Sequence, residues 1–248
     1  MFTSRSHIIL PVEFSGFQRI CISVNPSNMQ LFLNSKMLKN HRFQKSAIKN
    51  NSNIQAEIVV KIINKSKGMF LFASYHIEKI YKQTNRASVQ NILNILPDNI
   101  FDFYRKTMER IKQQKAESCY FAKEALLFIS HTKRLLHVNE LRHTLGVSAD
   151  DTEFDESQCM DNKVLIDICA GLVKIDETRD VIGLTHQTLQ EFFNTFPERL
   201  CEDSDSKITK TCLVYLSFDV FGSGLCADDN ALQERLEHHV FFPYTVQY

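Results

Sequence analysis

The chain has 248 residues, of which 44% are hydrophobic and 23% charged, and it contains only 7 glycines and 5 prolines. A chain of this length and apolar content can bury the core of one large domain or of two small ones. No run of about 18 apolar residues could cross a bilayer, and no signal peptide begins at Met1. The few glycines argue against a β-sandwich. We therefore expect a globular, cytoplasmic protein without a membrane partner.

The cysteines and the charges give further information on the class of protein. Seven cysteines are an odd number and none belongs to a Cys-x-x-Cys pair, which favours free thiols in a reducing compartment. Residues 1–150 carry 22 Lys and Arg against 10 Asp and Glu, whereas residues 151–248 carry 7 against 19. Two halves of opposite charge can attract each other or face different partners, and unequal solvated faces would give the same counts.

Short strands and then helices are predicted for the first half of the chain. The segment "RICISV" at 19–24 has the composition of a strand, and Ser27 with Gln30 has the spacing of a capping box that starts a helix. Residues 40–56 are polar and basic, typical of a loop with frayed helical ends. Three amphipathic helices are then predicted, within 67–82, 88–97 and 99–111.

A winged helix is predicted from the pattern that follows residue 117. Helical periodicity occupies 117–132, 135–147 and 160–173, and an acidic insert separates the second of these helices from the third. Two strands with alternating character come next, "GLVKID" and "VIGLT", joined by the polar turn "ETRD". Three helices followed by a β-hairpin describe a winged helix.

The stretch "LTHQTLQEFF" places an imidazole, His186, between the second strand and another helix. Thr188 and Glu191 have capping-box spacing, and the apolar positions Leu189, Phe192, Phe193 and Phe196 repeat along one helical face. His186 could fill the core, bind a metal, or donate to a phosphate, because a helix N-terminus is a ready anion site. Considered without other evidence, His186 is more typical of a histidine in the core or at a helix cap.

No catalytic or metal centre can be identified. The sequence has no Gly-x4-Gly-Lys-Ser/Thr phosphate loop, Gly-x-Gly-x-x-Gly, Gly-x-Ser-x-Gly or His-Glu-x-x-His. The nine histidines and seven cysteines never reach zinc-ligand spacing, and His238-His239 reads as part of a solvated tail. We expect no enzymatic activity, no metal and no cofactor on its own.

A winged helix also suggests nucleic acid as a partner. Sequence readout needs a basic third helix with Lys or Arg for the phosphates. Here that helix carries Asp161, Asp167 and Lys163 after an acidic insert, a surface that would repel a duplex. No DNA binding is therefore expected, although a nucleic-acid-binding winged-helix protein stays the alternative.

Four segments in order, "FTSR", "KGMFLFASYHIEKI", "ILPDNIFDFYRKTMERI" and "ICAGLVKIDETRDVIGLTHQTLQEFF", resemble the C-terminal half of a NACHT-type STAND nucleotide switch. The likeness extends from residue 1 to about residue 242 and is greatest to the fungal group with ankyrin repeats. The later part is also similar to the winged-helix domain of GPI inositol-deacylase.

The resemblance implies two nucleotide contacts. In the "TSR" segment, Arg5 would be the sensor 1 arginine, which senses the γ-phosphate, with Thr3 and Ser4 beside it. In "THQTLQEFF", His186 would touch the β-phosphate of ADP in the closed state, and exchange for ATP would open the molecule and permit oligomerisation. The Walker A and B motifs of that family are absent from this chain, so ADP or ATP is implied only for the intact architecture.

The resulting expectation is a mostly α fold with a remnant of an α/β P-loop core, a helical domain and a winged helix. The predicted domains are a core remnant (1–26), a helical domain (27–116), a winged helix (117–197) and a helical linker (198–248) towards an ankyrin-like repeat region that this chain lacks. We expect a non-catalytic regulatory and protein-interaction fragment of a signalling switch, whose partners are other proteins or the missing NTPase half.

Overall fold

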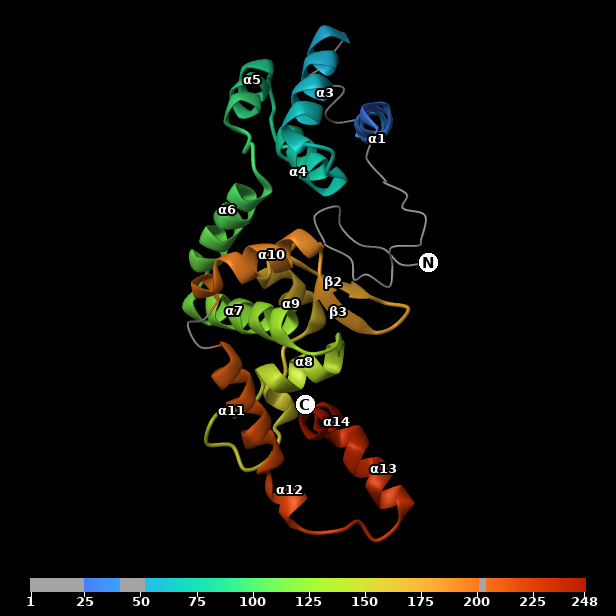
Figure 1. Ribbon diagram of the computed structural model, residues 1–248, viewed down its shortest axis with the longest axis vertical. Helices are drawn as coiled ribbons and strands as arrows, with labels where there is room; N and C mark the ends of the chain where they lie inside the picture. Colours follow the sequence, from blue (N-terminus) through green and yellow to red (C-terminus); the bar gives the residue numbers. More distant parts are fainter. Residues whose placement is uncertain (1–24, 41–51, 201–203) are drawn as a thin grey trace, which may run out of the picture. The chain divides into compact units, whose positions relative to one another are not determined.

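Figure 1 shows the computed structural model, which describes residues 25–40, 52–200 and 204–248. The described chain is mostly helical with one small antiparallel sheet, which confirms the predicted fold class at this level. It divides into two compact units, residues 1–99 and 100–248. The predicted strand at 19–24 lies outside the described residues, as does nearly all of the predicted core remnant.

The first unit is a helical bundle. Its described helices are α1 (Pro26–Lys39), α3 (Ser52–Ser66), α4 (Phe70–Tyr81) and α5 (Arg86–Ile95). Helices α1, α3 and α4 contact one another and α5 packs on α4. Their apolar stripes meet in one core, which includes Met29, Leu33, Ile58, Ile62, Ala73, Ile77, Ile80 and Leu93. Helical spacing therefore brings the apolar positions of each helix to one shared interior.

The start of α1 differs from the predicted capping box. Asn25 is the N-cap, and its side-chain oxygen accepts a hydrogen bond from the N–H of Ser27 at 2.9 Å. Pro26 is the first helical residue, where its missing N–H leaves no donor unsatisfied. The predicted Ser27–Gln30 box was wrong because the proline fixes a helical φ one residue earlier.

The second unit contains a winged helix preceded by one long helix. In chain order its elements are α6 (Ile100–Lys112), α7 (Ala116–His131), β1 (Leu136–His137), α8 (Val138–Leu145), η2 (Glu156–Gln158), α9 (Asn162–Ile168), β2 (Val173–Asp176), β3 (Val181–Leu184), α10 (Gln187–Thr195) and η3 (Pro197–Arg199). The predicted helical domain included α6, but α6 contacts α7 and α10 and belongs to the second unit.

The sheet has the strand order β1-β3-β2, with both pairs antiparallel. The β2–β3 hairpin was predicted, and its register pairs Lys174 with Gly183 and Asp176 with Val181. Strand β1 was not predicted, because it is two residues long and only its pairing with β3 defines it. Gly171, at φ +81°, turns the chain from α9 into β2, a conformation that side chains with a Cβ rarely adopt.

Helix α7 lies at the centre of this unit. Ala122, Ala125, Leu126 and Ile129 are buried as the periodicity predicts. Leu127 and Phe128 are buried as well, because α6, α8, α9, α11 and β3 cover α7 from several sides. A single apolar stripe would have left those two positions exposed.

The segment predicted as a linker, residues 198–248, is largely helical. It comprises η3 and then α11 (Ser204–Leu216), α12 (Asp219–Gly222), α13 (Asp229–His238) and α14 (Phe242–Gln247). Helix α11 packs on α7 and α14. The hydroxyl of Tyr244 accepts a hydrogen bond from the N–H of Lys133 at 3.1 Å, and the Arg134 guanidinium lies 5.1 Å from the Tyr244 ring centroid. Whether a repeat region follows stays a prediction.

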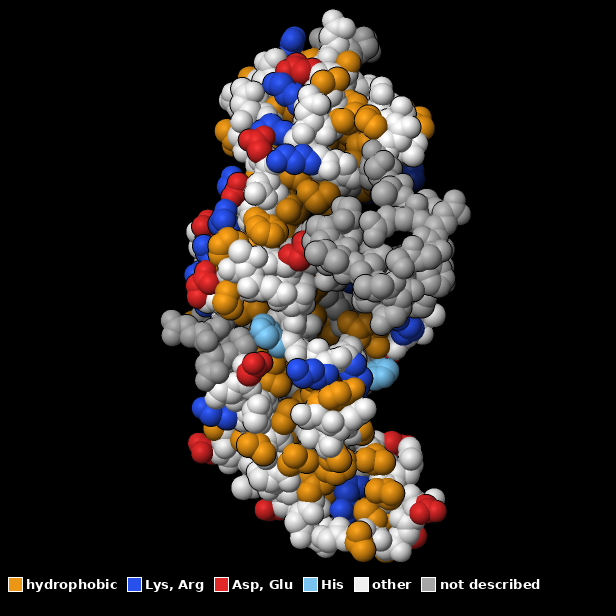
Figure 2. Space-filling model, in the orientation of Figure 1, with side chains coloured by type: hydrophobic (Ala, Val, Ile, Leu, Met, Phe, Trp, Pro, Cys, Tyr) orange, Lys and Arg blue, Asp and Glu red, His pale blue; other side chains and the backbone are white. Residues whose placement is uncertain are grey.

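Apolar side chains nevertheless remain exposed in this C-terminal segment. Figure 2 shows hydrophobic side chains gathered in the region of α13 and α14. The exposed large side chains of the segment are Leu213, Leu225, Leu232, Val246 and Tyr248. Among the described helices of the chain, none is long and apolar enough to cross a membrane.

Candidate functional site

His186 is the N-cap of α10. The chain leaves β3 in an extended conformation that continues through His186 (φ −156°, ψ 148°), so the helix begins at Gln187. The N–H of Thr188 donates to His186 Nδ1 at 3.1 Å. A ring nitrogen that accepts this bond carries no proton, so the neutral imidazole holds its proton on Nε2. The helix cap therefore fixes the tautomer and makes Nε2–H the donor.

The predicted Thr188–Glu191 capping box was wrong. Thr188 is the second residue of α10 and is buried, so its hydroxyl points into the protein instead of capping the helix. That hydroxyl lies 2.7 Å from the Tyr104 hydroxyl and 2.9 Å from His186 Nδ1. Since Nδ1 accepts with one lone pair, the N–H and the hydroxyl of Thr188 share it, and Tyr104 then donates to the Thr188 hydroxyl. A buried network thus joins α6 to the imidazole and holds the ring in place.

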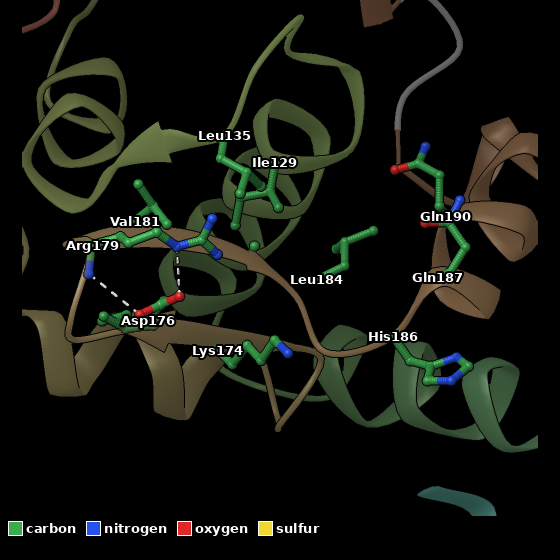
Figure 3. A pocket seen from close by; sticks show the side chains of 12 residues that line it. Ile129, Leu135, Lys174, Asp176, Arg179, Val181, Leu184, His186, Gln187 and Gln190 are labelled. Atoms are coloured by element: carbon green, nitrogen blue, oxygen red, sulfur yellow. Dashed lines mark hydrogen bonds and ion pairs between the residues drawn. The ribbon is translucent and has the colours of Figure 1, made fainter. Parts of the chain in front are cut away.

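His186 lines a cavity of about 490 Å³ on the outer face of the three-stranded sheet, with α7 and α10 at its margin (Figure 3). Its apolar wall includes Ile129, Leu135, Val181 and Leu184, and its polar lining includes Lys174, Asp176, Arg179, Gln187 and Gln190. His186 and Arg179 lie at opposite ends of the view in Figure 3. The cavity therefore combines an apolar wall with groups that can donate hydrogen bonds to an anion.

Gly183 keeps the middle of this face open. A Cβ added at Gly183 would lie 3.2 Å from Leu135 Cδ2, tighter than ordinary contact. A glycine inside a strand often marks a place where another group approaches the backbone closely. Any larger residue here would press on Leu135 and reduce the cavity.

The two cations of the cavity differ in their environment. Arg179 Nε donates to Asp176 Oδ2 at 2.8 Å, and this contact lowers the pKa of the Asp176 carboxyl from its usual value. Lys174 is exposed and makes no hydrogen bond or ion pair with the residues that the structure describes. Lys174 is therefore the uncompensated positive charge of the cavity.

Of the two residues predicted to contact a nucleotide, the structure describes one. His186 lines one end of the cavity, with its ring turned away from Lys174 and Arg179 in Figure 3, whereas Arg5 lies outside the described residues. Lys174 and Arg179 were not predicted as site residues. The hairpin register contained a signal for Lys174, because its pairing with Gly183 puts a cation across from a residue without a side chain.

Metal ligands and reactive thiols are the other candidate chemistries among the described residues. Within them, no group of three His, Cys, Asp or Glu side chains could hold a metal ion. Burial raises the pKa of the Cys169 thiol to about 12, and burial also raises the pKa of Cys159 and Cys212. Thiols with raised pKa values are poor nucleophiles at neutral pH.

The third helix of the winged helix, α9, carries few groups for DNA. Asp161 caps it by accepting the N–H of Lys163 at 2.7 Å. Its exposed side chains include Lys163, Val164 and Asp167, so a single cation is offset by an acidic residue. This composition agrees with the prediction that the winged helix does not bind DNA. That statement stays a prediction.

Comparison with known proteins identifies the domain that holds this cavity. Residues 107–202 match the family described as "GPI inositol-deacylase, winged helix domain". The chain is also 24% identical over 180 residues to "Azaphilone pigments biosynthesis cluster protein L" of Monascus ruber, a match that covers 64% of this chain. The chain spans 37% of the length of that relative. No solved structure matches the chain.

Proposed function

We propose that this chain is a non-catalytic regulatory segment of a nucleotide-dependent signalling switch of the NACHT type. Its winged helix would present His186 to a phosphate of a nucleotide held by an NTPase core. The observation that carries the proposal is the capping geometry, because Nδ1 is used by α10 and the proton sits on Nε2. Such a nitrogen can donate to a phosphate oxygen without any change of tautomer.

The surroundings of His186 support an anionic ligand. Lys174 contributes an uncompensated charge and the Arg179 guanidinium contributes further donors to the same cavity, whereas the amide nitrogen of Gln190 already donates to Ser130 and Asn194. The network from Tyr104 through Thr188 holds the ring, so little side-chain entropy is lost when a ligand binds. In this role the chain supplies binding and conformational coupling, and phosphoryl transfer would depend on a phosphate loop and a Mg²⁺ site elsewhere.

A protein partner is the second part of the proposal. Contiguous apolar patches on a protein surface commonly mark protein contacts, and Figure 2 shows hydrophobic side chains gathered in the region of α13 and α14. The C-terminal segment exposes Leu225 fully and leaves Val246 64% exposed, so this end of the chain offers a surface to a further domain or another protein.

The test uses the protein encoded by the complete reading frame that contains this chain. After purification, its bound nucleotide would be released and quantified by chromatography. We expect near-stoichiometric ADP in the wild type and a clear loss in His186→Ser. Serine can cap α10 but cannot reach a phosphate with a ring nitrogen. The matched control is His137→Ser, since His137 is the N-cap of α8 and does not line the cavity.

Three outcomes would contradict the proposal. They are ADP retained in His186→Ser, equal loss in both variants, and turnover of ATP by the 248-residue chain alone. Tight, strongly salt-dependent binding of duplex DNA would favour the alternative function.

A further inference from the structure

A second cavity, of about 280 Å³, lies between α7, the end of α8 and α11. Helix α11 contributes Lys207, Lys210 and Thr211, α7 contributes Tyr120 and Glu124, and the loop after α8 contributes Ser148. All of these residues belong to the second unit. The cavity therefore brings two lysines of the C-terminal segment next to a loop of the winged helix.

The two lysines are not equally compensated. Lys207 forms an ion pair with Glu124, a carboxylate that is only 8% exposed, and lies 5.1 Å from the Tyr120 ring centroid. Lys210 makes no ion pair and no hydrogen bond with the described part of the chain. One positive charge in this cavity is thus without a counter-charge.

Ser148 lines the same cavity from an exposed, acidic loop. Its N–H donates to Asp151 Oδ2 at 2.6 Å, and its carbonyl oxygen accepts the Asp151 N–H at 3.2 Å. The Ser148 hydroxyl makes no hydrogen bond within the described residues, so it is an accessible nucleophile. Asp150, Asp151 and Glu153 follow at the second, third and fifth positions. Protein kinases select substrates by such charge patterns, and an acidic run complements a basic substrate groove.

We propose that Ser148 is a phosphorylation site for an acidophilic Ser/Thr protein kinase, and that its phosphoryl group occupies this cavity and pairs with Lys210. In the reaction, Ser148 Oγ bonds to the γ-phosphorus of ATP while the bond from that phosphorus to the β–γ bridging oxygen breaks. ADP leaves, and the hydroxyl proton passes to the kinase's base. No oxidation or reduction takes place.

Phosphorylation of Ser148 would hold the C-terminal segment more firmly against the winged helix. A phosphoserine adds about −1.5 to −2 charges at neutral pH and three strong acceptor oxygens. Because α11 is the first α-helix of the C-terminal segment, pairing with Lys210 would fasten that segment to the winged helix. Repulsion from Asp150 and Asp151 opposes this pairing, so the lysine is required for the effect.

The test treats the full 248-residue chain with a Ser/Thr kinase that selects an acidic residue at the third position after serine. Tandem mass spectrometry would map the phosphate, and hydrogen exchange would compare the modified and unmodified chains. We expect phosphate on Ser148, absent in Ser148→Ala, and amide exchange about fivefold slower in 144–151 and 204–216, as one exposed charge pair allows.

Two controls distinguish the effect of adding a phosphate from the effect of its ion pair with Lys210. Lys210→Gln should accept the phosphate but lose the slower exchange, and its circular dichroism should match the wild type because Lys210 is exposed. Ser223, an exposed serine with Cys226 and no acidic residue at the third position after it, should stay unmodified. Phosphate found only at other residues would overturn the proposal. It would also be overturned by equal protection in Lys210→Gln or by unchanged exchange after modification of Ser148.

Discussion

His76 is a fully buried imidazole on α4 whose two ring nitrogens have no hydrogen-bond partner among the described residues. Its ring centroid lies 4.1 Å from that of Phe72. Burial, and then the positive charge of Lys65, lower the pKa of His76 from 6.5 to about 4, and the Asp98 carboxylate opposes this only weakly. Lys65 is held in place by hydrogen bonds to the Leu96 carbonyl at 2.8 Å and to Asp98 at 2.6 Å.

This shift makes the first unit sensitive to acid. The unfolded chain binds a proton at His76 below about pH 6.5, whereas the folded chain does so only near pH 4. The free energy of unfolding must therefore fall as the pH falls through this window. Between pH 7.5 and pH 5, the two pKa values correspond to a loss of about 2 kcal/mol from this residue.

The perturbation is His76→Leu, which replaces an unpartnered polar ring with an apolar side chain of similar volume. At pH 7.5 we expect the variant to be as stable as the wild type or more stable, because no buried nitrogen is left unsatisfied. At pH 5 the variant should lack the loss of about 2 kcal/mol that His76 causes in the wild type.

Urea unfolding followed by circular dichroism at both pH values measures this difference. Burial also lowers the pKa of His143 in the second unit to about 4, but that residue is unchanged in both proteins and its contribution cancels. Gln233→Leu, at an exposed position of α13, is the control and should keep the wild-type pH dependence because it removes no titratable group. Equal pH dependence in the wild type and His76→Leu would refute the reasoning.

Two further predictions concern buried polar contacts of the second unit. Thr188→Val should lower the free energy of unfolding by about 1–3 kcal/mol, because the buried hydrogen bond between the Tyr104 and Thr188 hydroxyls is lost. In a thermal melt the control Thr195→Val, at an exposed site of α10, should change stability by less than about 0.5 kcal/mol. Glu140→Gln should cost about 2 kcal/mol, since Glu140 is 4% exposed and both of its oxygens accept from Arg134 at 2.6 and 2.7 Å. Arg134 is partly exposed, so the lost free energy of unfolding is smaller than for a fully buried ion pair. If the effect of Glu140→Gln disappears at high salt, the pair is screened by solvent and the role given to burial is wrong.

The helical pattern of this protein could be predicted from its sequence. The apolar positions chosen in 117–132 and 160–173 are buried, and the β2–β3 hairpin forms around the predicted polar turn. These features depend on side-chain periodicity and turn residues, which act between neighbours in the chain. The match of residues 107–202 to a winged-helix family agrees with that prediction.

The candidate site was predicted only in part. His186 was identified from its place before a helix, but its hydrogen bonds were assigned to the wrong residue. Capping-box spacing fits Thr188 and Glu191 equally well in the sequence. The extended backbone that continues from β3 through His186 decides which side chain can reach the free N–H groups of α10.

The sequence by itself determined the helices of the winged helix, the hairpin and the presence of a histidine at the start of α10, because local periodicity and turn residues specify them. Only the tertiary structure decided that Lys174, Gly183 and His186 share one cavity, and that Ser148 and Lys210 share another. These residues lie far apart in the chain or on different elements. Their proximity depends on strand register and on how helices pack around α7, and neither is encoded by any single segment.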